Sequence, residues 1–159
     1  MQANDEVIRR FFRALMQRNW ESLQECYHAK VRFTDEVFDL SGSNAVAMWR
    51  MLCAETRDLQ IKVDLVSANA STGQARWQMR YVAGQNGRSV RKIIESSFEF
   101  RGGQIVRHTD RFDFWKWASQ ALGASGRLLG WSRLLRKKVR SKATRQLAEF
   151  ADALGRQRE

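Results

Sequence analysis

Four consecutive segments that alternate between apolar and polar residues constrain this chain more than any other feature. They run over 59–68, 74–83, 89–101 and 104–114. Short separators join them, and these contain the glycine and asparagine that tight turns require: Ser71-Thr72-Gly73, Gln85-Asn86-Gly87 and Arg101-Gly102-Gly103. Because a parallel crossover needs a dozen or more residues, such short separators predict hairpins. The second half of the chain therefore predicts an antiparallel sheet.

Helical spacing of apolar residues is typical of the chain before this sheet. Residues 5–18 predict an amphipathic helix, and Asn19 can cap a second helix whose apolar side carries Trp20, Leu23 and Tyr27. Alternation over 31–38 predicts a strand, and a third helix is expected after Ser41-Gly42-Ser43. The carboxyl-terminal third is helical again. The sequence therefore predicts an α+β fold with three helices in its first half and a C-terminal helical extension.

Three ionisable side chains fall on strand faces that are otherwise apolar. Asp35 shares a face with Phe33, and His108 and Asp110 share a face with Phe112. Burying a carboxylate costs several kcal/mol unless it is paired or hydrogen-bonded. In one interpretation His108 and Asp110 satisfy each other and Asp35 caps a neighbouring element. In the other, the three side chains line a substrate cavity and act as general acids or bases.

The order of these elements resembles the nuclear-transport-factor-2-like superfamily. The resemblance is carried by Val31-Arg32-Phe33-Thr34-Asp35 and by Gly-Gly-Gln-Ile-Val-Arg-His-Thr-Asp-Arg-Phe-Asp at 102–113. This superfamily includes ketosteroid isomerases, SnoaL-type polyketide cyclases and limonene-epoxide hydrolases. The resemblance implies a cone of strongly bent, mainly antiparallel sheet that encloses an apolar pocket in a homodimer. It covers residues 1–117, and we expect residues 118–159 to form a basic helical extension of the same domain.

The resemblance also implies roles for individual residues. Asp35 matches the proton-shuttling aspartate of ketosteroid isomerases, although Phe11 and Ser96 stand where those enzymes keep their oxyanion donors. The polyketide cyclases imply an acid at Asp110, with His108 as its partner. We therefore expect catalytic roles for Asp35, His108 and Asp110, and an apolar pocket wall formed by Tyr27, Phe33, Trp49, Phe98 and Phe112.

Three further residues are weaker candidates. Arg76 and Asp110 match two of the three positions of the epoxide hydrolases' water-activating aspartate, arginine and aspartate, but Gln78 occupies the third. Glutamine can orient water but cannot relay a proton, which disfavours epoxide hydrolysis, and an arginine on the polar side of its strand is commonly at the surface. Asp113 is an alternative to Asp110 as the acid.

We expect a protein that binds an apolar small molecule, with cofactor-free isomerase, cyclase or hydrolase chemistry. A non-catalytic binding or interaction module is the alternative. The sequence has no phosphate-binding glycine loop, metal-ligand cluster or nucleophile motif, so no cofactor and no metal are expected. Cys26 and Cys53 lie in apolar helical patterns and predict small core residues. Since no signal peptide and no membrane-spanning run are visible, we expect a cytoplasmic protein.

The net charge of +11 is concentrated near the carboxyl terminus. From Phe114 to Ala148 there are basic residues and no acidic one, and an apolar helical stripe is predicted at Leu128, Trp131, Leu135, Val139 and Leu147. One interpretation is a helix that closes the cone or packs across a dimer. Another is an anionic membrane surface, bound through Arg133, Arg136, Lys137, Lys138 and Arg140. Nucleic acid is less favoured, because the chain has no motif that recognises DNA or RNA.

Overall fold

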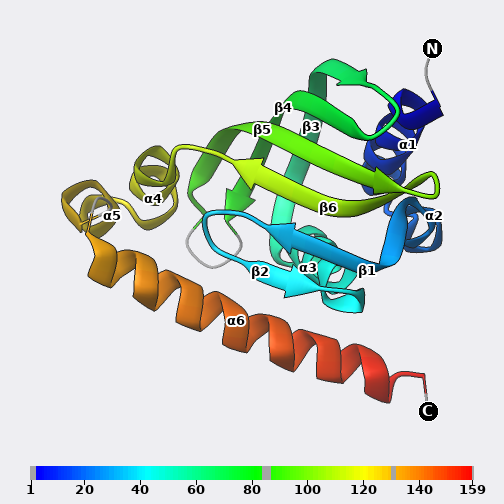
Figure 1. Ribbon diagram of the computed structural model, residues 1–159. Helices are drawn as coiled ribbons and strands as arrows, with labels where there is room; N and C mark the ends of the chain where they lie inside the picture. The colour runs from blue at the N-terminus through cyan, green and yellow to red at the C-terminus, as the bar shows by residue number, and fades with distance from the viewer. Residues whose placement is uncertain (1–2, 84–86, 130–131, 159) are drawn as a thin grey trace.

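A six-stranded, bent sheet with helices packed on one face makes up the body of the protein (Figure 1). The computed structural model describes residues 3–83, 87–129 and 132–158. In chain order the elements are α1 (Ala3–Gln17), α2 (Trp20–Cys26), β1 (Tyr27–Thr34), β2 (Asp39–Ser41), α3 (Ser43–Glu55), β3 (Thr56–Ala68), β4 (Thr72–Ala83), β5 (Ser89–Arg101), β6 (Gln104–Arg111), α4 (Phe114–Leu122), α5 (Ala124–Leu129) and α6 (Arg133–Arg156).

The sheet has the strand order β2-β1-β6-β5-β4-β3. Strands β3 to β6 form the predicted series of antiparallel hairpins, and β1 also pairs with β2 in antiparallel fashion. Only the β1–β6 pair is parallel among the described strands. The predicted α+β fold, with its bent, mainly antiparallel sheet and C-terminal helices, is therefore confirmed.

The first predicted strand, 31–38, is displaced toward the amino terminus. Tyr27 was expected in the second helix, but it begins β1 and pairs with Ile105 of β6, because α2 ends at Cys26. The strand stops at Thr34 because Asp35 starts a tight turn, in which its backbone N–H donates to the carbonyl of Phe38 (2.9 Å). The predicted last strand is also shorter and ends at Arg111.

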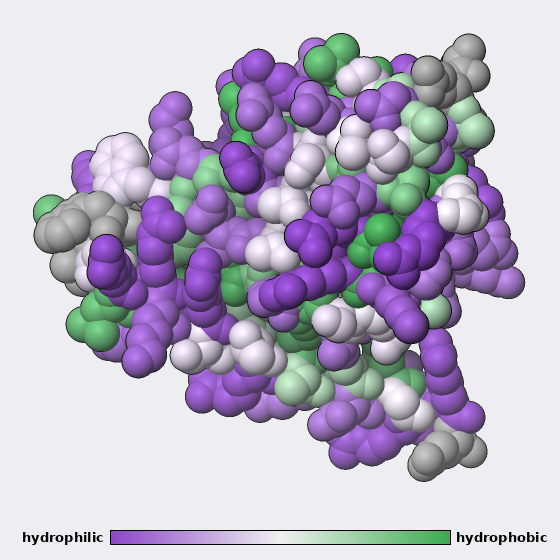
Figure 2. Space-filling model, in the orientation of Figure 1, coloured by the Kyte–Doolittle hydropathy of each residue, from purple (hydrophilic) through white to green (hydrophobic). Residues whose placement is uncertain are grey.

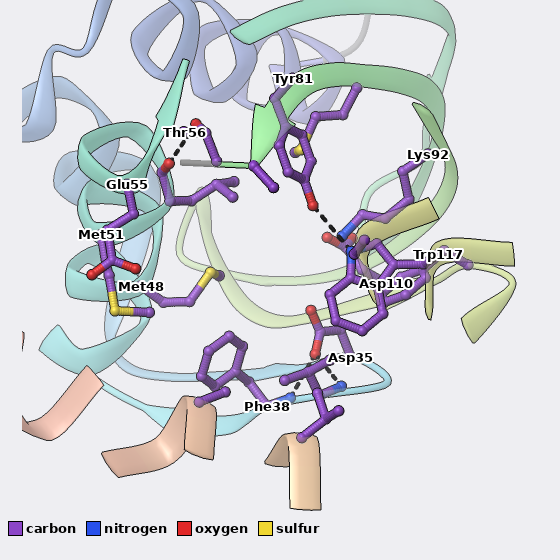
Figure 3. Close-up of a pocket in the computed structure, with 18 of the residues that line it drawn as sticks. Asp35, Phe38, Met48, Met51, Glu55, Thr56, Tyr81, Lys92, Asp110 and Trp117 are labelled. Atoms are coloured by element: carbon purple, nitrogen blue, oxygen red, sulfur yellow. Dashed lines mark hydrogen bonds between the residues drawn. The ribbon is translucent and has the colours of Figure 1, made fainter. Parts of the chain in front are cut away.

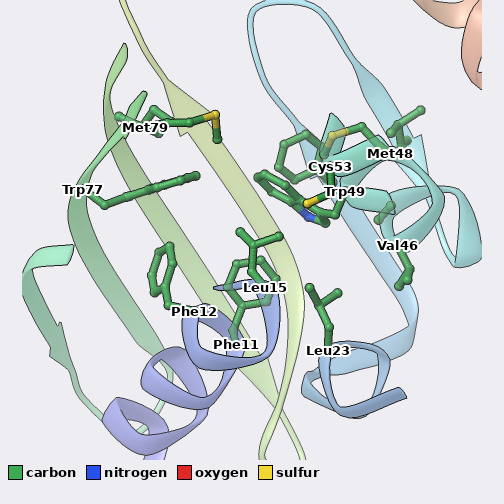
Figure 4. Close-up of a cluster of buried hydrophobic side chains, with 14 of the residues drawn as sticks. Phe11, Phe12, Leu15, Leu23, Val46, Met48, Trp49, Cys53, Trp77 and Met79 are labelled. Atoms are coloured by element: carbon green, nitrogen blue, oxygen red, sulfur yellow. The ribbon is translucent and has the colours of Figure 1, made fainter. Parts of the chain in front are cut away.

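Aromatic side chains dominate the core between α1, α3 and the sheet (Figure 4). Phe11 and Phe12 of α1 project toward Trp49 of α3 and Trp77 of β4, with ring centroids 5.8 Å apart for Phe11–Trp49 and 5.1 Å for Phe12–Trp77. Edge-to-face contacts of this kind contribute about 0.5–1.5 kcal/mol beyond area burial. Both cysteines are buried free thiols in this core, as predicted.

Helix α6 runs along the edge of the body beside α3 (Figure 1). Its inward face carries Leu135, Val139 and Leu147. Leu128 of the predicted stripe is exposed, because it belongs to a separate helix, α5, which ends at Leu129. Trp131 lies outside the described residues. Arg136 forms an ion pair with Glu36 (Nη1–Oε2 3.3 Å), which ties α6 to the turn after β1. None of the helices described is both long and apolar enough to cross a membrane.

Helices α4 and α5 pack so closely that only glycine fits at position 126. A Cβ atom added to Gly126 would lie 1.9 Å from the carbonyl oxygen of Ala118. We expect Gly126→Ala to destabilise the fold by about 1–3 kcal/mol, as overpacking does, and to lower the midpoint of thermal unfolding. The matched control is Gly155→Ala in α6, where nothing lies within 4 Å of the added atom. Equal midpoints for the two variants would contradict the close α4–α5 contact.

Candidate functional site

A cavity of about 540 Å³ opens between the sheet, α3, α4 and α6 (Figure 3). Most of its wall is apolar, and its acidic groups are Asp35, Glu55 and Asp110. Its volume lies within the range of about 300–1,000 Å³ that small-molecule sites occupy. The apolar wall includes Val37, Phe38, Met48, Trp49, Met51, Leu52, Met79, Tyr81, Ile94, Phe112, Trp117, Leu122 and Val139.

Asp35 reaches this cavity from the turn that follows β1. Its Oδ1 atom accepts hydrogen bonds from the backbone N–H groups of Val37 (2.7 Å) and Phe38 (2.6 Å). Burial raises the pKa of the Asp35 carboxyl above its ordinary value, while the positive charge of Lys92 and the two backbone donors oppose that rise. Asp35 therefore both forms a turn and presents a desolvated carboxyl group to the cavity.

Asp110 enters the cavity wall from β6, and one of its two oxygens is already occupied. The Oδ1 atom lies 2.5 Å from Ser96 Oγ and 2.7 Å from His108 Nε2. Within the part of the chain that the structure describes, no side chain or backbone group hydrogen-bonds to Oδ2. The carboxylate is thus fixed through one oxygen and offers the other to whatever fills the cavity.

The donors to Asp110 belong to a buried polar network with a defined direction. An indole N–H can only donate, so Trp49 donates to Tyr27 Oη (3.1 Å), and the tyrosine hydroxyl is hydrogen-bonded to His108 Nδ1 (2.8 Å). Since an ionised carboxylate only accepts, His108 Nε2 donates a proton to the hydrogen bond with Asp110 Oδ1. On the other side Trp77 donates to Ser96 Oγ (2.8 Å), which donates to Asp110. Both arms of the network end on the same carboxylate oxygen.

His108 lies behind Asp110 and does not line the cavity. It is fully buried, and the rings of Phe11, Phe33 and Phe98 surround it at centroid distances of 4.5–5.4 Å. Both ring nitrogens have partners within the protein. The imidazole can therefore orient Asp110, but a molecule in the cavity does not touch it.

The cavity brings together only part of the predicted site. Trp49 and Phe112 lie in its wall, but Tyr27, Phe33 and Phe98 pack one layer deeper, around His108. All five were expected in the pocket wall, because neither helical spacing nor strand alternation separates core side chains from those that line a cavity.

Arg76, Gln78 and Asp113 lie outside the cavity. Arg76 is exposed on the outer face of β4, and Gln78, on the same face, donates to Asp64 (3.0 Å) and accepts from Arg91 (2.9 Å). Asp113 is the N-cap of α4, where its Oδ1 accepts from the backbone N–H of Lys116 (3.1 Å). Among the residues described, no three His, Cys, Asp or Glu side chains are grouped to hold a metal ion.

Lys92 is a cavity residue that the sequence analysis missed. Its ammonium group lies 4.0 Å from the centroid of the Phe112 ring, and its charge acts on Asp35. Alternation along β5 places Lys92 on the inward face with Val90 and Ile94, so the test that singled out Asp35 also identifies this lysine. Val139 of the predicted C-terminal stripe also lies in the wall, in keeping with the interpretation of a helix that closes the cone, whereas the wall residues of α4 carry no comparable signal in the sequence.

Comparisons with known proteins support a single family. A family model described as a SnoaL-like domain matches residues 8–108. One similar solved structure is an NTF2-like protein of unknown function from Burkholderia pseudomallei, with 20% identity and a TM-score of 0.63, over 71% of this chain and 92% of that one. A second is an LEH-like epoxide hydrolase from M. tuberculosis, with 15% identity and a TM-score of 0.64, over 80% of this chain and 93% of that one. A third is a putative polyketide cyclase from Xanthomonas campestris, with 18% identity and a TM-score of 0.62, over 76% of this chain and 97% of that one. At these identities the structures show a shared fold. A search of the curated proteins gives no significant match.

The raised pKa of Asp35 predicts a pH-dependent stability difference. Between the ordinary and the raised pKa, the folded protein holds a proton that the unfolded chain releases, so the Asp35 contribution to stability falls as pH rises through that window. Asp35→Asn keeps the Oδ1 acceptor and removes the buried charge. We expect this variant to unfold at higher urea concentration than the wild type at pH 7, with the difference disappearing below the ordinary pKa of an aspartate.

Asp39→Asn is the control with the opposite sign. The hydrogen bond from Arg32 lowers the pKa of Asp39, so its ionised form stabilises the fold at neutral pH and that contribution is lost in acid. A wild type that is more stable than Asp35→Asn at pH 7 would contradict the desolvation of Asp35.

The buried network predicts a large cost for removing the Tyr27 hydroxyl. Tyr27→Phe leaves the Trp49 N–H and His108 Nδ1 without partners, at about 1–3 kcal/mol for each unsatisfied buried group. Urea unfolding at neutral pH measures this loss. The control is Tyr81→Phe, which removes one hydrogen bond from Trp117 (3.0 Å) at the cavity wall, where water can replace it. A smaller loss for Tyr27→Phe than for Tyr81→Phe would show that the network does not stabilise the fold.

Proposed function

The chain belongs to the SnoaL-like domain family, and on this premise we propose that its cavity binds an apolar small molecule and exchanges protons with it. The observation that carries this proposal is the pair of carboxyl groups, Asp35 and Asp110, in the wall of one largely apolar cavity. Burial of Asp35 disfavours its charged form and raises its pKa, which makes this carboxylate a better proton acceptor.

Asp35 is the proton acceptor in this proposal. With Oδ1 held by two backbone N–H groups, the carboxyl group has a fixed orientation toward the cavity. A ketone bound there loses a proton from the carbon beside its carbonyl to Asp35, which leaves an enolate and a neutral carboxylic acid. Asp35 then returns the proton to carbon. Lys92, whose charge acts on Asp35, is one of two lysines in the cavity lining and can stabilise negative charge on the enolate oxygen.

Asp110 has a binding role in this scheme, and His108 is a positioning residue. Hydrogen bonds from His108 and Ser96 fix the Asp110 carboxylate, so that Oδ2 can accept a hydrogen bond from a hydroxyl group of the ligand. The similarity to a putative polyketide cyclase supports a ligand with both rings and oxygen substituents.

Epoxide hydrolysis receives less support than proton exchange. One solved structure with this fold is an LEH-like epoxide hydrolase, but Arg76 and Gln78, the residues here at two of the three expected positions, lie on the outer face of the sheet. Only Asp110 of that set lines the cavity.

A non-catalytic binding protein is the second candidate. This candidate is favoured by the two hydrogen bonds that Asp35 Oδ1 accepts in the turn before β2. They explain an aspartate at this position without any catalytic role. Under this alternative the cavity binds its ligand and no proton leaves carbon.

Deuterium exchange into 2-tetralone, an apolar bicyclic ketone, separates the two candidates. We expect the wild-type protein in D₂O to accelerate exchange at the carbons beside the carbonyl, with saturation as the ketone concentration rises. General base catalysis contributes about 10²–10⁴-fold, so Asp35→Asn should lower the rate by at least about a hundredfold. Proton NMR follows the loss of the exchanging signal.

Two controls make the outcome specific. Asp39→Asn removes an exposed carboxylate outside the cavity and should leave the rate unchanged. Ala143→Phe fills the cavity from α6 without altering either carboxyl group, so it should raise the concentration needed for saturation. Saturable binding of the ketone with the same exchange rate in the wild type and Asp35→Asn would establish the non-catalytic alternative.

A further inference from the structure

Exposed apolar side chains gather at the end of the molecule formed by α4, α5 and the start of α6. Trp115, Leu122, Leu128 and Leu134 are all exposed there, and Leu128 and Leu134 are 68% and 66% exposed. In the space-filling view, green side chains at this end lie among purple ones (Figure 2). Burying such leucines against an apolar phase is favourable. A group of exposed apolar side chains, unlike single scattered ones, indicates a surface that binds a partner.

Positive charge adjoins these apolar side chains along α6. Residues at helical spacing on its outward face line one shallow hollow of the surface: Leu134, Lys137, Lys138, Ser141, Lys142 and Arg145. Among the described residues, Lys137 and Lys138 have no acidic partner. Over 114–148 the chain contains no aspartate or glutamate to offset this charge. Apolar residues flanked by unpaired cations are typical of surfaces that bind anionic lipid.

Two of the cations assigned to a membrane surface from the sequence serve the fold instead. Arg136 pairs with the Glu36 carboxylate and lies 4.7 Å from the centroid of the Phe114 ring, while Arg140 Nε donates to the Glu36 carbonyl (3.0 Å). The available set is therefore Arg133, Lys137, Lys138, Lys142 and Arg145, which we call the basic face of α6.

We propose that the leucines at 128 and 134 and the basic face of α6 dock the protein on an anionic phospholipid surface. The leucines enter the interfacial zone, and the lysines and arginines contact the phosphates of the head groups, each adding about 1 kcal/mol near such a surface. Nucleic acid also attracts this charge, but exposed leucines gain nothing from a phosphate backbone. Trp115, whose Nε1–H donates a hydrogen bond to the Arg127 carbonyl (3.0 Å), contributes further apolar surface beside these leucines.

The cavity opens beside this docking surface. Lys142 lines both the cavity and the hollow on the basic face, and the exposed Leu122 belongs both to the cavity wall and to the apolar group. Leu122, Lys142 and Glu55 are the exposed residues of the cavity lining, so the cavity opens to the surface where they lie. If the cavity binds an apolar molecule, as proposed above, that molecule passes between the bilayer and the cavity over a short path. Docking itself does not depend on that function.

Vesicle flotation tests the docking. The full-length protein should float with vesicles of equal parts phosphatidylcholine and phosphatidylglycerol at low salt, and should remain at the bottom with phosphatidylcholine alone. Lys137→Glu/Lys138→Glu should weaken binding at least about tenfold. Leu128→Ser/Leu134→Ser, which changes no charge, should weaken it about fivefold. Circular dichroism checks that each variant is folded, as expected for exposed positions.

Matched controls on the rest of the surface make the result specific. Arg76→Glu/Arg80→Glu changes the net charge as much as the lysine pair does, and Leu65→Ser/Ile93→Ser removes two exposed apolar side chains elsewhere. Both should bind vesicles as the wild type does. Asp35→Asn should also float normally, so failure of proton exchange and failure of docking are distinguishable.

Three results would overturn the proposal. The first is no flotation with anionic vesicles. The second is equal weakening by Arg76→Glu/Arg80→Glu and by the lysine pair, which would indicate attraction by net charge alone. The third is unchanged vesicle binding in Leu128→Ser/Leu134→Ser together with tighter binding to a duplex oligonucleotide, which would assign the basic face to nucleic acid.

Discussion

Burial of an imidazole and a carboxylate among aromatic rings is the constraint on which the rest of this structure depends. His108 and Asp110 have almost no contact with solvent, so every hydrogen-bonding atom that the cavity does not serve needs a partner inside the protein. Those partners come from β1, α3, β4 and β5, through Tyr27, Trp49, Trp77 and Ser96. An unsatisfied buried group costs about 1–3 kcal/mol against a net stability of about 5–15 kcal/mol. The network therefore helps apolar packing to fix the position of α3 on the sheet.

The same constraint divides the interior into two parts. On one side of Asp110 lies a dry core in which every polar atom of His108 is satisfied, and on the other lies the cavity, where Oδ2 of Asp110 and the Asp35 carboxyl group are available. Asp35 adds to this asymmetry, because burial raises its pKa and its ionised form is poorly accommodated. A desolvated carboxyl group in a cavity wall, such as Asp35, is a common feature of functional sites.

Sequence reasoning predicted the parts that depend on local pattern and missed those that depend on tertiary packing. The hairpins followed from glycine-containing separators, and strand alternation placed Asp110 on the inward face of β6. Asp35 lies in the same cavity wall as expected, but it reaches the wall from the turn after β1 and not from a strand. Tyr27 was misplaced because its helical spacing continues past Cys26, where pairing with Ile105 overrides it. Alternation predicts which face of the sheet a side chain lies on, but not whether it reaches the core or the cavity. Phe33 and Phe98 were therefore expected in the cavity wall, but they lie in the core, and residues of α4 and α6 take part in the wall.

Glu36 joins two regions that were described separately. Its neighbour Asp35 presents the carboxyl group, while its own carboxylate and carbonyl receive Arg136 and Arg140 of α6. These contacts attach α6 directly to the turn, so the helix and the backbone next to Asp35 have a fixed position relative to each other. The arginines of an outer helix are thus part of the scaffold that holds the Asp35 carboxyl group in the cavity wall.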